Sequence, residues 1–268
     1  MPQVSRVMHI KTDEEIAKMR EGGKILSDIL RRVVKMARPG ITTEDLDRFA
    51  ESRILGAGGL PAFKGYTTRY ASQPFPSTLC TSLNAEVVHA PAVPKRALKD
   101  GDLLSIDIGM RYPAVGGLYT DMATTVAIGK VSKEALRLME VTHEALKIGI
   151  RAVRAGASIA RIGRTVQDYV EREGFSVVRD LVGHGVGHAV HEDPYVPNYY
   201  DARLEEVIIP ECLPLAIEPM VAAGGPAVRT ADDGWTVVTA DGRLSAHFEA
   251  TIVLGKKGVE ILTPIVLL

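Results

Sequence analysis

Three of the seven histidines in this 268-residue chain lie within eight residues of one another, in a glycine-rich stretch. The stretch Leu181–Pro194 holds His184, His188 and His191 together with three glycines. Glycine lets the backbone come close to an ion or a substrate, and imidazole nitrogen is a common ligand of transition metals. We therefore predict that this loop contributes to a metal and substrate site.

Four acidic residues lie inside apolar runs that have the character of β-strands: Asp107, Asp121, Glu218 and Glu249. In the first run, strand alternation puts aliphatic side chains on one face and Asp107 on the other. Asp121 follows 14 residues later, so a hairpin would bring the two carboxylates together. Buried carboxylates are costly when unpaired, and divalent cations commonly offset that cost. We predict a carboxylate-rich hydrolase site with two metal ions; the alternative is that each acid lies in a turn or in solvent.

The histidines admit more than one assignment. His184, between two glycines, is the best candidate for an imidazole ligand, and His191 is expected to contact substrate from the same loop. His89 ends an apolar strand and is expected to point into the same cleft, whereas His188 has no assigned role. A zinc cluster of His184, His188 and His191 is a competing interpretation, but it leaves the four acids unexplained.

Two other kinds of site are poorly supported. The glycines at 183, 185 and 187 are spaced somewhat like those of a phosphate-binding loop, but no Lys-Ser or Lys-Thr pair follows them. The Gly-x-Ser-x-Gly motif of many serine hydrolases does not occur in the sequence.

Composition narrows the class of protein further. Hydrophobic residues make up 46% and charged residues 24%, as in ordinary globular proteins. A net charge of −1 gives no argument for nucleic acid or an anionic membrane, and no apolar run is long enough to span a bilayer. Two cysteines, Cys80 and Cys212, are too few for a disulfide framework. We therefore expect a cytoplasmic protein.

Two pairs of amphipathic helices are predicted, over 12–38 with 42–56 and over 133–156 with 158–174. Strand-like segments follow each pair, which favours an α+β fold with a largely antiparallel sheet. The order recurs after 116 residues, although chance similarity is an alternative. We predict one catalytic domain over 1–268, with halves of about 12–128 and 129–254 related by a pseudo-twofold axis. The expected strands are 78–90, 102–110, 119–128, 176–181, 214–221, 235–239 and 246–254.

The candidate ligands occur, in order, in motifs that closely resemble those of type I methionine aminopeptidases, which are metallopeptidases of the pita-bread fold. The resemblance covers nearly the whole chain, from Ile10 to Thr263. Its specific motifs are Ser82–His89, Ser105–Gly109, Gly183–Gly187, His191–Pro194, Ile217–Met220 and Asp233–Thr236. The resemblance implies a pita-bread fold, in which two similar halves and their helices surround one site on a curved sheet.

The resemblance also implies a ligand set for two divalent ions: Asp107, Asp121, His184, Glu218 and Glu249. Asp107 and Glu249 would bridge the two ions. Oxygen-rich ligation with one imidazole suits Co, Mn, Fe or Zn. Two neighbouring ions lower the pKa of a bridging water, and the resulting hydroxide would attack the first peptide bond.

Further roles follow from the same resemblance. Glu218 would shuttle the proton, His191 would stabilise the oxyanion, and His89 would contact the scissile amide or the leaving amine. An apolar pocket would select methionine, with Tyr66 as a further candidate at its edge. Ordinary core packing is the alternative role for the aromatic wall residues. The expected walls are Phe75, Cys80 and Trp235.

Three departures from the family pattern affect specificity. The connection over 65–76 is longer than the family's short loop and should border the methionine pocket. Val190 stands before His191 where the family usually carries an aromatic residue. Near the last ligand, the usual Gln-Phe/Tyr-Glu-His-Thr is replaced by His-Phe-Glu-Ala-Thr at 247–251, with Ala250 in place of histidine. We expect this change to alter local hydrogen bonding and metal affinity.

The function predicted from these features is metal-dependent removal of the N-terminal methionine from nascent polypeptides with a small second residue. A Xaa-Pro aminopeptidase or prolidase-like enzyme of the same fold is the enzymatic alternative, although such enzymes usually carry an additional N-terminal domain. A metal-free pita-bread module that binds ribosomes or nucleic acid is the alternative from another class. We expect a monomer that contacts the ribosome at most transiently and binds neither nucleic acid nor membrane.

Overall fold

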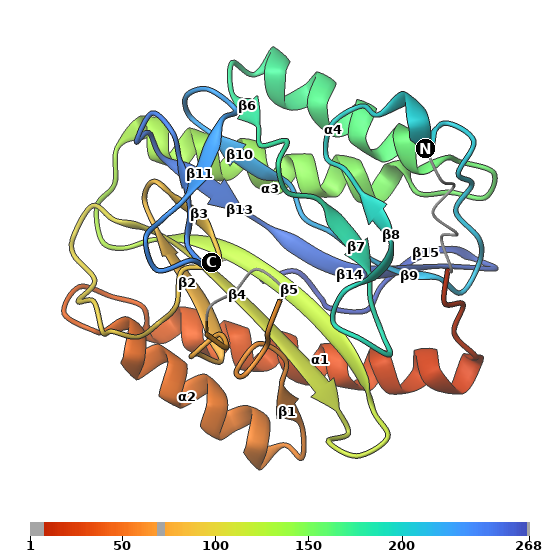
Figure 1. Ribbon diagram of the computed structural model, residues 1–268, viewed down its shortest axis with the longest axis horizontal. Coiled ribbons are helices and arrows are strands. Elements are labelled where there is room, and N and C mark those ends of the chain that lie inside the picture. The colour runs from red at the N-terminus through yellow and green to blue at the C-terminus, as the bar shows by residue number, and fades with distance from the viewer. Residues whose placement is uncertain (1–7, 69–72, 267–268) are drawn as a thin grey trace.

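The computed structural model describes residues 8–68 and 73–266, in which two helix pairs flank a curved β-sheet (Figure 1). The pairs lie at opposite ends of the sheet in this view. The first pair packs on strands of the first half of the chain, and the second pair packs on later strands. The four α-helices of the described ranges are α1 (Asp13–Met36), α2 (Thr43–Gly56), α3 (Lys133–Ala152) and α4 (Ile159–Arg172).

The main sheet contains nine strands within the described residues, and every recorded pairing in it is antiparallel. Its path is β1-β4-β5-β14-β9-β7-β8, with β2 on β4 and β15 on β14. This arrangement confirms the predicted α+β class and the antiparallel sheet. The strands are β1 (Leu60–Pro61), β2 (Leu79–Leu83), β4 (Leu103–Tyr112), β5 (Leu118–Ala127), β7 (Gly183–Gly185), β8 (Glu192–Val196), β9 (Pro214–Ile217), β14 (Glu249–Gly255) and β15 (Gly258–Ile261).

Two smaller sheets of three strands lie beside the main sheet. The first joins β13 (Ser245–His247), β10 (Met220–Ala222) and β6 (Ser176–Val177). The second joins β11 (Val228–Thr230), β12 (Val237–Thr239) and β3 (Glu86–Val88). No helix in the part of the chain that the structure describes is long and apolar enough to cross a membrane.

Capping residues begin the helices close to their predicted positions. The Thr12 side chain accepts a hydrogen bond from the Glu15 N–H, and the Glu15 carboxylate accepts one from the Thr12 N–H at 2.8 Å. This reciprocal arrangement satisfies two donors of the first turn, and Thr42 forms the same arrangement at α2. Ser158 precedes α4 as predicted, but among the described residues its side chain makes no capping hydrogen bond. Its backbone instead pairs with Ile208.

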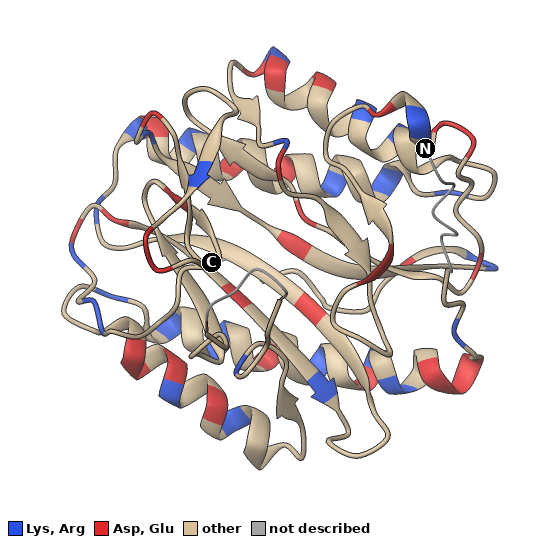
Figure 2. Ribbon diagram, in the orientation of Figure 1, with Lys and Arg blue, Asp and Glu red and all other residues tan. Residues whose placement is uncertain are grey.

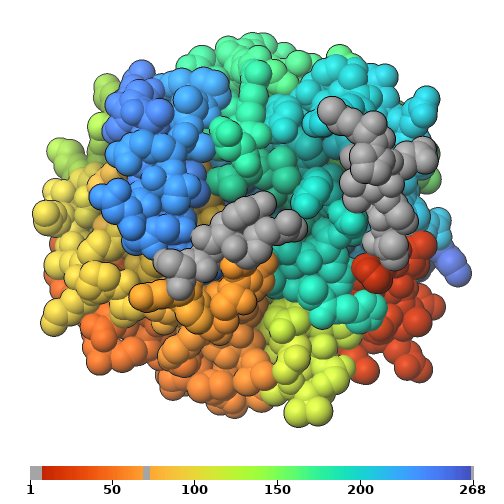
Figure 3. All heavy atoms as spheres, in the orientation of Figure 1, coloured from red at the N-terminus to blue at the C-terminus, as the bar shows by residue number. Residues whose placement is uncertain are grey.

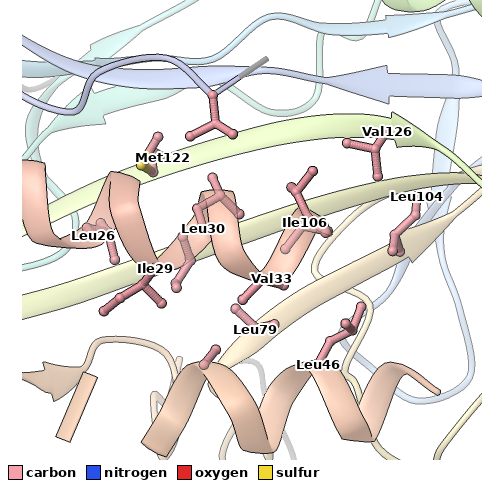
Figure 4. Packing of buried hydrophobic residues seen from close by; sticks show 14 of the residues in the cluster. Leu26, Ile29, Leu30, Val33, Leu46, Leu79, Leu104, Ile106, Met122 and Val126 are labelled. Atoms are coloured by element: carbon pink, nitrogen blue, oxygen red, sulfur yellow. The ribbon is translucent and has the colours of Figure 1, made fainter. Parts of the chain in front are cut away.

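The apolar faces of α1 and α2 pack against β2, β4 and β5 (Figure 4). Leu30 of α1, Leu46 of α2 and Ile106 of β4 are fully buried in this cluster. The alternation predicted for β4 is therefore confirmed, because its aliphatic side chains face the helices. Asp107 accordingly faces the other side of the sheet.

A second apolar cluster joins α3 and α4 to β9 and β14, with Leu146, Ile162 and Ile217 fully buried in it. Each helix pair thus has its own apolar contact with the sheet. Two helices followed by strands occur twice along the described chain, and the division into halves 12–128 and 129–254 stays a proposal.

The glycine-rich segment predicted as a loop contains strand β7. A β-carbon on Gly183 would overlap the carbonyl oxygen of Ala216, and one on Gly185 would overlap that of Asp193. These glycines therefore let the backbones of neighbouring strands approach closely. The segment predicted as a strand over 176–181 is extended only at 176–177.

Several short strands were not predicted from the sequence. β1, β11 and β15 have two to four residues each, too few for a clear alternation of apolar and polar side chains. β8 contains Pro194, which weakens a strand signal. Residues 69–72, in the middle of the long connection expected to border the pocket, lie outside the described residues.

Gly23 of α1 lies so close to the C-terminal segment that a β-carbon there would overlap the backbone carbonyl of Leu262. We expect Gly23→Ala to lower the free energy of unfolding by about 1–3 kcal/mol, because the overpacking cost exceeds the roughly 1 kcal/mol helix-propensity gain of alanine. Urea-induced unfolding measures the change.

Gly56→Ala, at the end of α2, is the matched control because no heavy atom lies within 4 Å of its added β-carbon. This variant should be as stable as the wild type or slightly more stable. If Gly23→Ala were also neutral, the close contact between α1 and the C-terminal segment would not constrain the fold.

Candidate metal centre and active site

Cross-strand pairing brings three of the candidate ligands, Asp107, Asp121 and Glu249, to one face of the sheet. Ala123 of β5 pairs with Asp107 of β4 on one side and with Glu249 of β14 on the other. Residues that pair directly point to the same face of a sheet. Asp121 precedes Ala123 by two residues and therefore shares this face. The predicted hairpin between β4 and β5 is confirmed, and the small side chain of Ala123 leaves space between the carboxylates.

A second row of pairs brings the remaining ligands to the same face. Ala216 of β9 pairs with His184 of β7 and with Thr251 of β14. Glu218 follows Ala216 by two residues, and Glu249 precedes Thr251 by two. Strand alternation therefore directs both carboxylates to the side of His184. The ligand-type side chains thus come from strands of both proposed halves.

The atoms of this cluster are close enough to share an ion. Asp121, His184 and Glu249 each offer a ligand atom, and these atoms lie within 4.8 Å of one another. The Nδ1 atom of His184 lies 2.9 Å from the carbonyl oxygen of Gly185, which can only accept a hydrogen bond. Nδ1 therefore carries the proton, and Nε2 keeps the lone pair that a metal ion needs. This Nε2 lies 3.4 Å from Oε1 of Glu218.

Burial dominates the electrostatics of the acidic cluster. Asp107 is 8% exposed and Glu249 2%, and among the described residues one oxygen of each has no hydrogen-bond partner. Burial raises the pKa of Asp107 to about 6 and that of Glu218 to about 8. Burial, followed by neighbouring negative charge, raises the pKa of Asp121 and Glu249 well above the usual range. Carboxylate oxygens with free lone pairs and one imidazole fit a divalent metal ion.

Acidic segments coloured red in Figure 2 lie inside strands between the two helix pairs, whereas most other charged segments lie on helices and loops. Segments of both proposed halves adjoin on this face of the molecule (Figure 3). The side chains of the cluster line a cavity of about 470 Å³. All the site residues singled out in the sequence contribute to its wall: Phe75, Cys80, His89, Asp107, Asp121, His184, His191, Glu218, Trp235 and Glu249.

Two further histidines of the cavity wall are held in defined conformations. The ring of His191 lies beside that of His184, with centroids 4.5 Å apart. Its Nδ1 atom lies 2.9 Å from the hydroxyl oxygen of Tyr66, and this hydrogen bond orients the ring. His89 has a φ of 60°, an uncommon value for a residue other than glycine. Burial lowers the pKa of His89 to about 4, so its imidazole is neutral at pH 7.

Part of the apolar cavity wall belongs to one cluster, in which Phe75 and Cys80 are buried together with Phe63 and Val190. The ring of Trp235 packs edge-on against Phe75, with centroids 5.3 Å apart. Burial, followed by nearby carboxylates, raises the pKa of the Cys80 thiol, so that this wall residue is uncharged. Val190 belongs to the cluster but does not line the cavity itself.

Long-range ion pairs hold the segment that carries His191, and the sequence does not predict them. The fully buried Nζ of Lys11 lies 2.6 Å from Oε2 of Glu192. Nε2 of His188, which had no assigned role, lies 2.7 Å from Oε1 of Glu15. Both pairs connect the start of the chain to the β7–β8 segment. Their partners are more than 170 residues apart, which explains why local patterns do not reveal them.

Two residues beside Glu249, His247 and Ala250, differ from the expected family pattern, and they have different surroundings. Ala250 is buried in the apolar cluster under α3 and α4, on the opposite face of β14. His247 is 1% exposed, and its Nε2 atom lies 3.6 Å from Oε2 of Glu218. In the sequence, His247 precedes Glu249 by two residues. In an extended chain this spacing puts both side chains on the same face, and this was the signal that could have identified His247.

Known proteins similar to this chain are metallopeptidases, in agreement with a cluster of metal-ligand side chains. Residues 17–256 match metallopeptidase family M24. A methionine aminopeptidase of Clostridium perfringens is 46% identical over 255 residues, which cover 95% of this chain and 98% of the relative. A crystal structure of methionine aminopeptidase from Thermotoga maritima matches with a TM-score of 0.89 and 39% identity, covering 96% and 99% of the two chains. The prolidase of Pyrococcus horikoshii shares the fold at 18% identity, with a TM-score of 0.73, and this chain spans 64% of it.

The pKa shifts predict how the stability of the metal-free protein depends on pH. Above about pH 7.5 the unfolded chain has released its carboxyl protons and nearly all of its histidine protons, whereas buried Glu218, with a pKa of about 8, still largely holds a proton in the folded state. The folded state then binds more protons, so stability falls as pH rises. Histidines with lowered pKa, such as His184 at about 3 and His89 at about 4, have the opposite effect below about pH 7.5, where the unfolded chain still binds histidine protons.

We therefore expect the thermal midpoint of chelator-treated protein to fall between about pH 7.5 and about pH 8.5, as measured by circular dichroism. Addition of Mn²⁺ should raise the midpoint more at about pH 8.5 than at about pH 7.5, because metal ions compete with protons for the carboxylates. A midpoint of the stripped protein that rises over this interval would contradict the protonated state of the acidic cluster.

Proposed function

This chain belongs to metallopeptidase family M24, and we propose that it removes the N-terminal methionine from polypeptides whose second residue is small. The observation that carries the proposal is the cluster of five ligand-type side chains in a cavity with apolar walls. Identity of 46% to a methionine aminopeptidase over nearly the full length supports the same substrate class. The likeness to prolidase at 18% identity concerns the fold alone, and the named relatives are peptidases rather than metal-free binding modules.

The proposed site holds two divalent ions through one imidazole and four carboxylates. This donor set suits Co, Mn, Fe or Zn. When bound, such ions lower the pKa of water and polarise the scissile carbonyl. Asp107 and Glu249 flank Ala123 on neighbouring strands, which supports a bridging role for both. The proposed ligands are Asp107, Asp121, His184, Glu218 and Glu249.

Three side chains of the cavity wall have proposed roles in proton transfer and charge stabilisation. Glu218 accepts the proton of the attacking water and passes it to the leaving amine. The raised pKa of Glu218, about 8, supports this role because its carboxyl group can hold a proton near neutral pH. His191, oriented by Tyr66, donates a hydrogen bond to the developing oxyanion. His89 contacts the scissile amide or the leaving amine.

Methionine selectivity is proposed to come from Phe75, Cys80 and Trp235. A flexible thioether side chain makes favourable contacts with aromatic rings, and the perpendicular packing of Phe75 and Trp235 presents both a ring face and a ring edge. Val190 packs in the same cluster, behind the wall residues. We propose that this pocket accepts methionine in preference to branched residues.

The proposed setting is the cytoplasm, where a monomer acts on the N-termini of nascent chains and contacts the ribosome only transiently. Two cysteines that form no disulfide, Cys80 and Cys212, suit a reducing compartment. The net charge of −1 offers no general attraction to nucleic acid or to anionic lipid.

The experiment that tests the proposal is a peptide-release assay on metal-stripped protein, with Mn, Fe, Co or Zn returned separately. Release of methionine from Met-Ala-Ser is expected only when metal is present, and Leu-Ala-Ser and Xaa-Pro peptides should remain intact. Cleavage of Xaa-Pro peptides alone would assign the protein to the prolidase-like alternative. A protein that neither binds metal nor releases any residue would have to be a binding module.

Asp107→Asn tests the ligand assignment, because the amide keeps the shape of the side chain but removes the charge proposed to bridge the ions. We expect kcat/KM for Met-Ala-Ser to fall about 100-fold or more, roughly 3 kcal/mol of transition-state stabilisation. Asp28→Asn is the control, since among residues 8–68 and 73–266 the ion pairs of Asp28 are surface pairs with Arg31 and Arg32 on α1. If Asp107→Asn were as active as Asp28→Asn, Asp107 would not be a metal ligand.

A further inference from the structure

His247 is a buried imidazole that has no part in the proposed reaction. It ends β13 and is 1% exposed. Within the described residues, neither of its ring nitrogens has a hydrogen-bond partner. A buried polar group without a partner costs free energy. The presence of an imidazole at this position therefore calls for a partner or a function.

The backbone of His247 is fixed on both sides. Its N–H donates to the hydroxyl oxygen of Thr125 at 2.9 Å, and the same hydroxyl donates to its carbonyl oxygen at 2.8 Å. On the other side, His247 pairs with Met220 of β10. The direction of the side chain is thus set by the β-structure around it.

The ring points toward two of the proposed metal ligands. Its Nε2 atom lies 3.6 Å from Oε2 of Glu218 and 4.0 Å from Oε2 of Glu249. The other oxygen of Glu218, Oε1, lies 3.4 Å from Nε2 of His184. Glu218 therefore lies between two imidazoles. His184 lines the cavity, whereas His247 is not part of the cavity wall that the described residues form.

We propose that His247 is a positioning residue that donates a hydrogen bond from Nε2 to Glu218, with Glu249 as the neighbouring acceptor. This inference rests on the metal site proposed above. An ionised carboxylate can only accept hydrogen bonds, and a neutral imidazole has one donor, so Nε2 must carry the proton. Nε2–H then holds Oε2 of Glu218 away from the cavity and leaves Oε1, beside His184, directed at the ion.

The present separation is slightly longer than a hydrogen bond, which for N–H to O spans about 2.7–3.2 Å. A movement of about half an ångström, shared by the Glu218 and His247 side chains, is enough to close the gap. Outer hydrogen bonds to metal ligands commonly change metal affinity or activity by about 10–100-fold. His247 thus controls how firmly Glu218 is presented to the metal.

His247→Leu and His247→Gln test this role on metal-stripped protein. Leucine removes the donor and keeps a bulky buried side chain, whereas the glutamine amide keeps a donor near the position of Nε2. Titration with Co²⁺ is followed by visible absorption and by competition with a chromophoric chelator. We expect the leucine variant to bind Co²⁺ about 10–100-fold more weakly with an altered spectrum, and the glutamine variant to stay within about threefold of wild type.

His143→Leu is the matched control. This half-buried imidazole packs against the Phe248 ring at a centroid distance of 5.4 Å, and the charged groups that affect it are Lys147 and Glu144 rather than the acidic cluster. Its Co²⁺ affinity and spectrum should equal those of the wild type. If His247→Leu does not fold, His247→Asn replaces it, because the shorter amide cannot reach the position of Nε2.

Three results would overturn the inference. A folded leucine variant with wild-type Co²⁺ affinity and spectrum would show that His247 does not orient the carboxylates. Equal loss of affinity in the leucine and glutamine variants, with the same spectral change, would identify the imidazole as a metal ligand instead. If the wild-type protein bound no Co²⁺, the proposed metal site itself would be wrong. Failure of the proposed function is therefore distinguishable from failure of the role of His247.

Discussion

Burial of four carboxyl groups on one face of a single sheet is the constraint on which the rest of the structure depends. Each charged oxygen removed from water costs free energy unless a cation or a hydrogen-bond donor replaces the solvent. Long antiparallel strands hold these groups in a fixed register, and Ala123 keeps the space between Asp107 and Glu249 open. The opposite face of the same strands is apolar and packs against the helices, which supplies the hydrophobic stabilisation that the acidic face lacks.

The site depends on contact between segments distant in sequence. Asp107 and Asp121 come from one hairpin, β4–β5, whereas His184 and Glu249 come from strands that follow α4. The pairing of β5 with β14, at Ala123 and Glu249, is the point where the two groups meet. Because only a few residues pair there, each residue of this junction affects the distances between ligands. Side chains behind the carboxylates, such as His247, therefore have influence without lining the cavity.

The residues proposed to select the substrate and those proposed to bind metal lie in different parts of the structure. Four of the proposed ligands lie on strands of the main sheet and Glu218 directly follows β9, whereas Phe75, His191 and Trp235 lie on connecting segments around the cavity. Connecting segments tolerate substitution better than paired strands. Val190, which was expected to depart from the family pattern, also lies in a connecting segment, outside the strands that carry ligands.

The local features follow from the amino-acid sequence alone: helix starts near Thr12 and Thr42, the alternation that separates Asp107 from its aliphatic neighbours, and the α+β class. It also contained the motifs that identify the candidate site residues, all of which line one cavity. These features depend on residues a few positions apart, which local pattern captures.

Three further features are visible only in the folded chain: Gly183–Gly185 is a strand, Lys11 pairs with Glu192, and His247 faces Glu218. Each of these depends on the register and approach of segments far apart in the chain. Such distances are set by the packing of the whole sheet, and no periodicity within one segment encodes them.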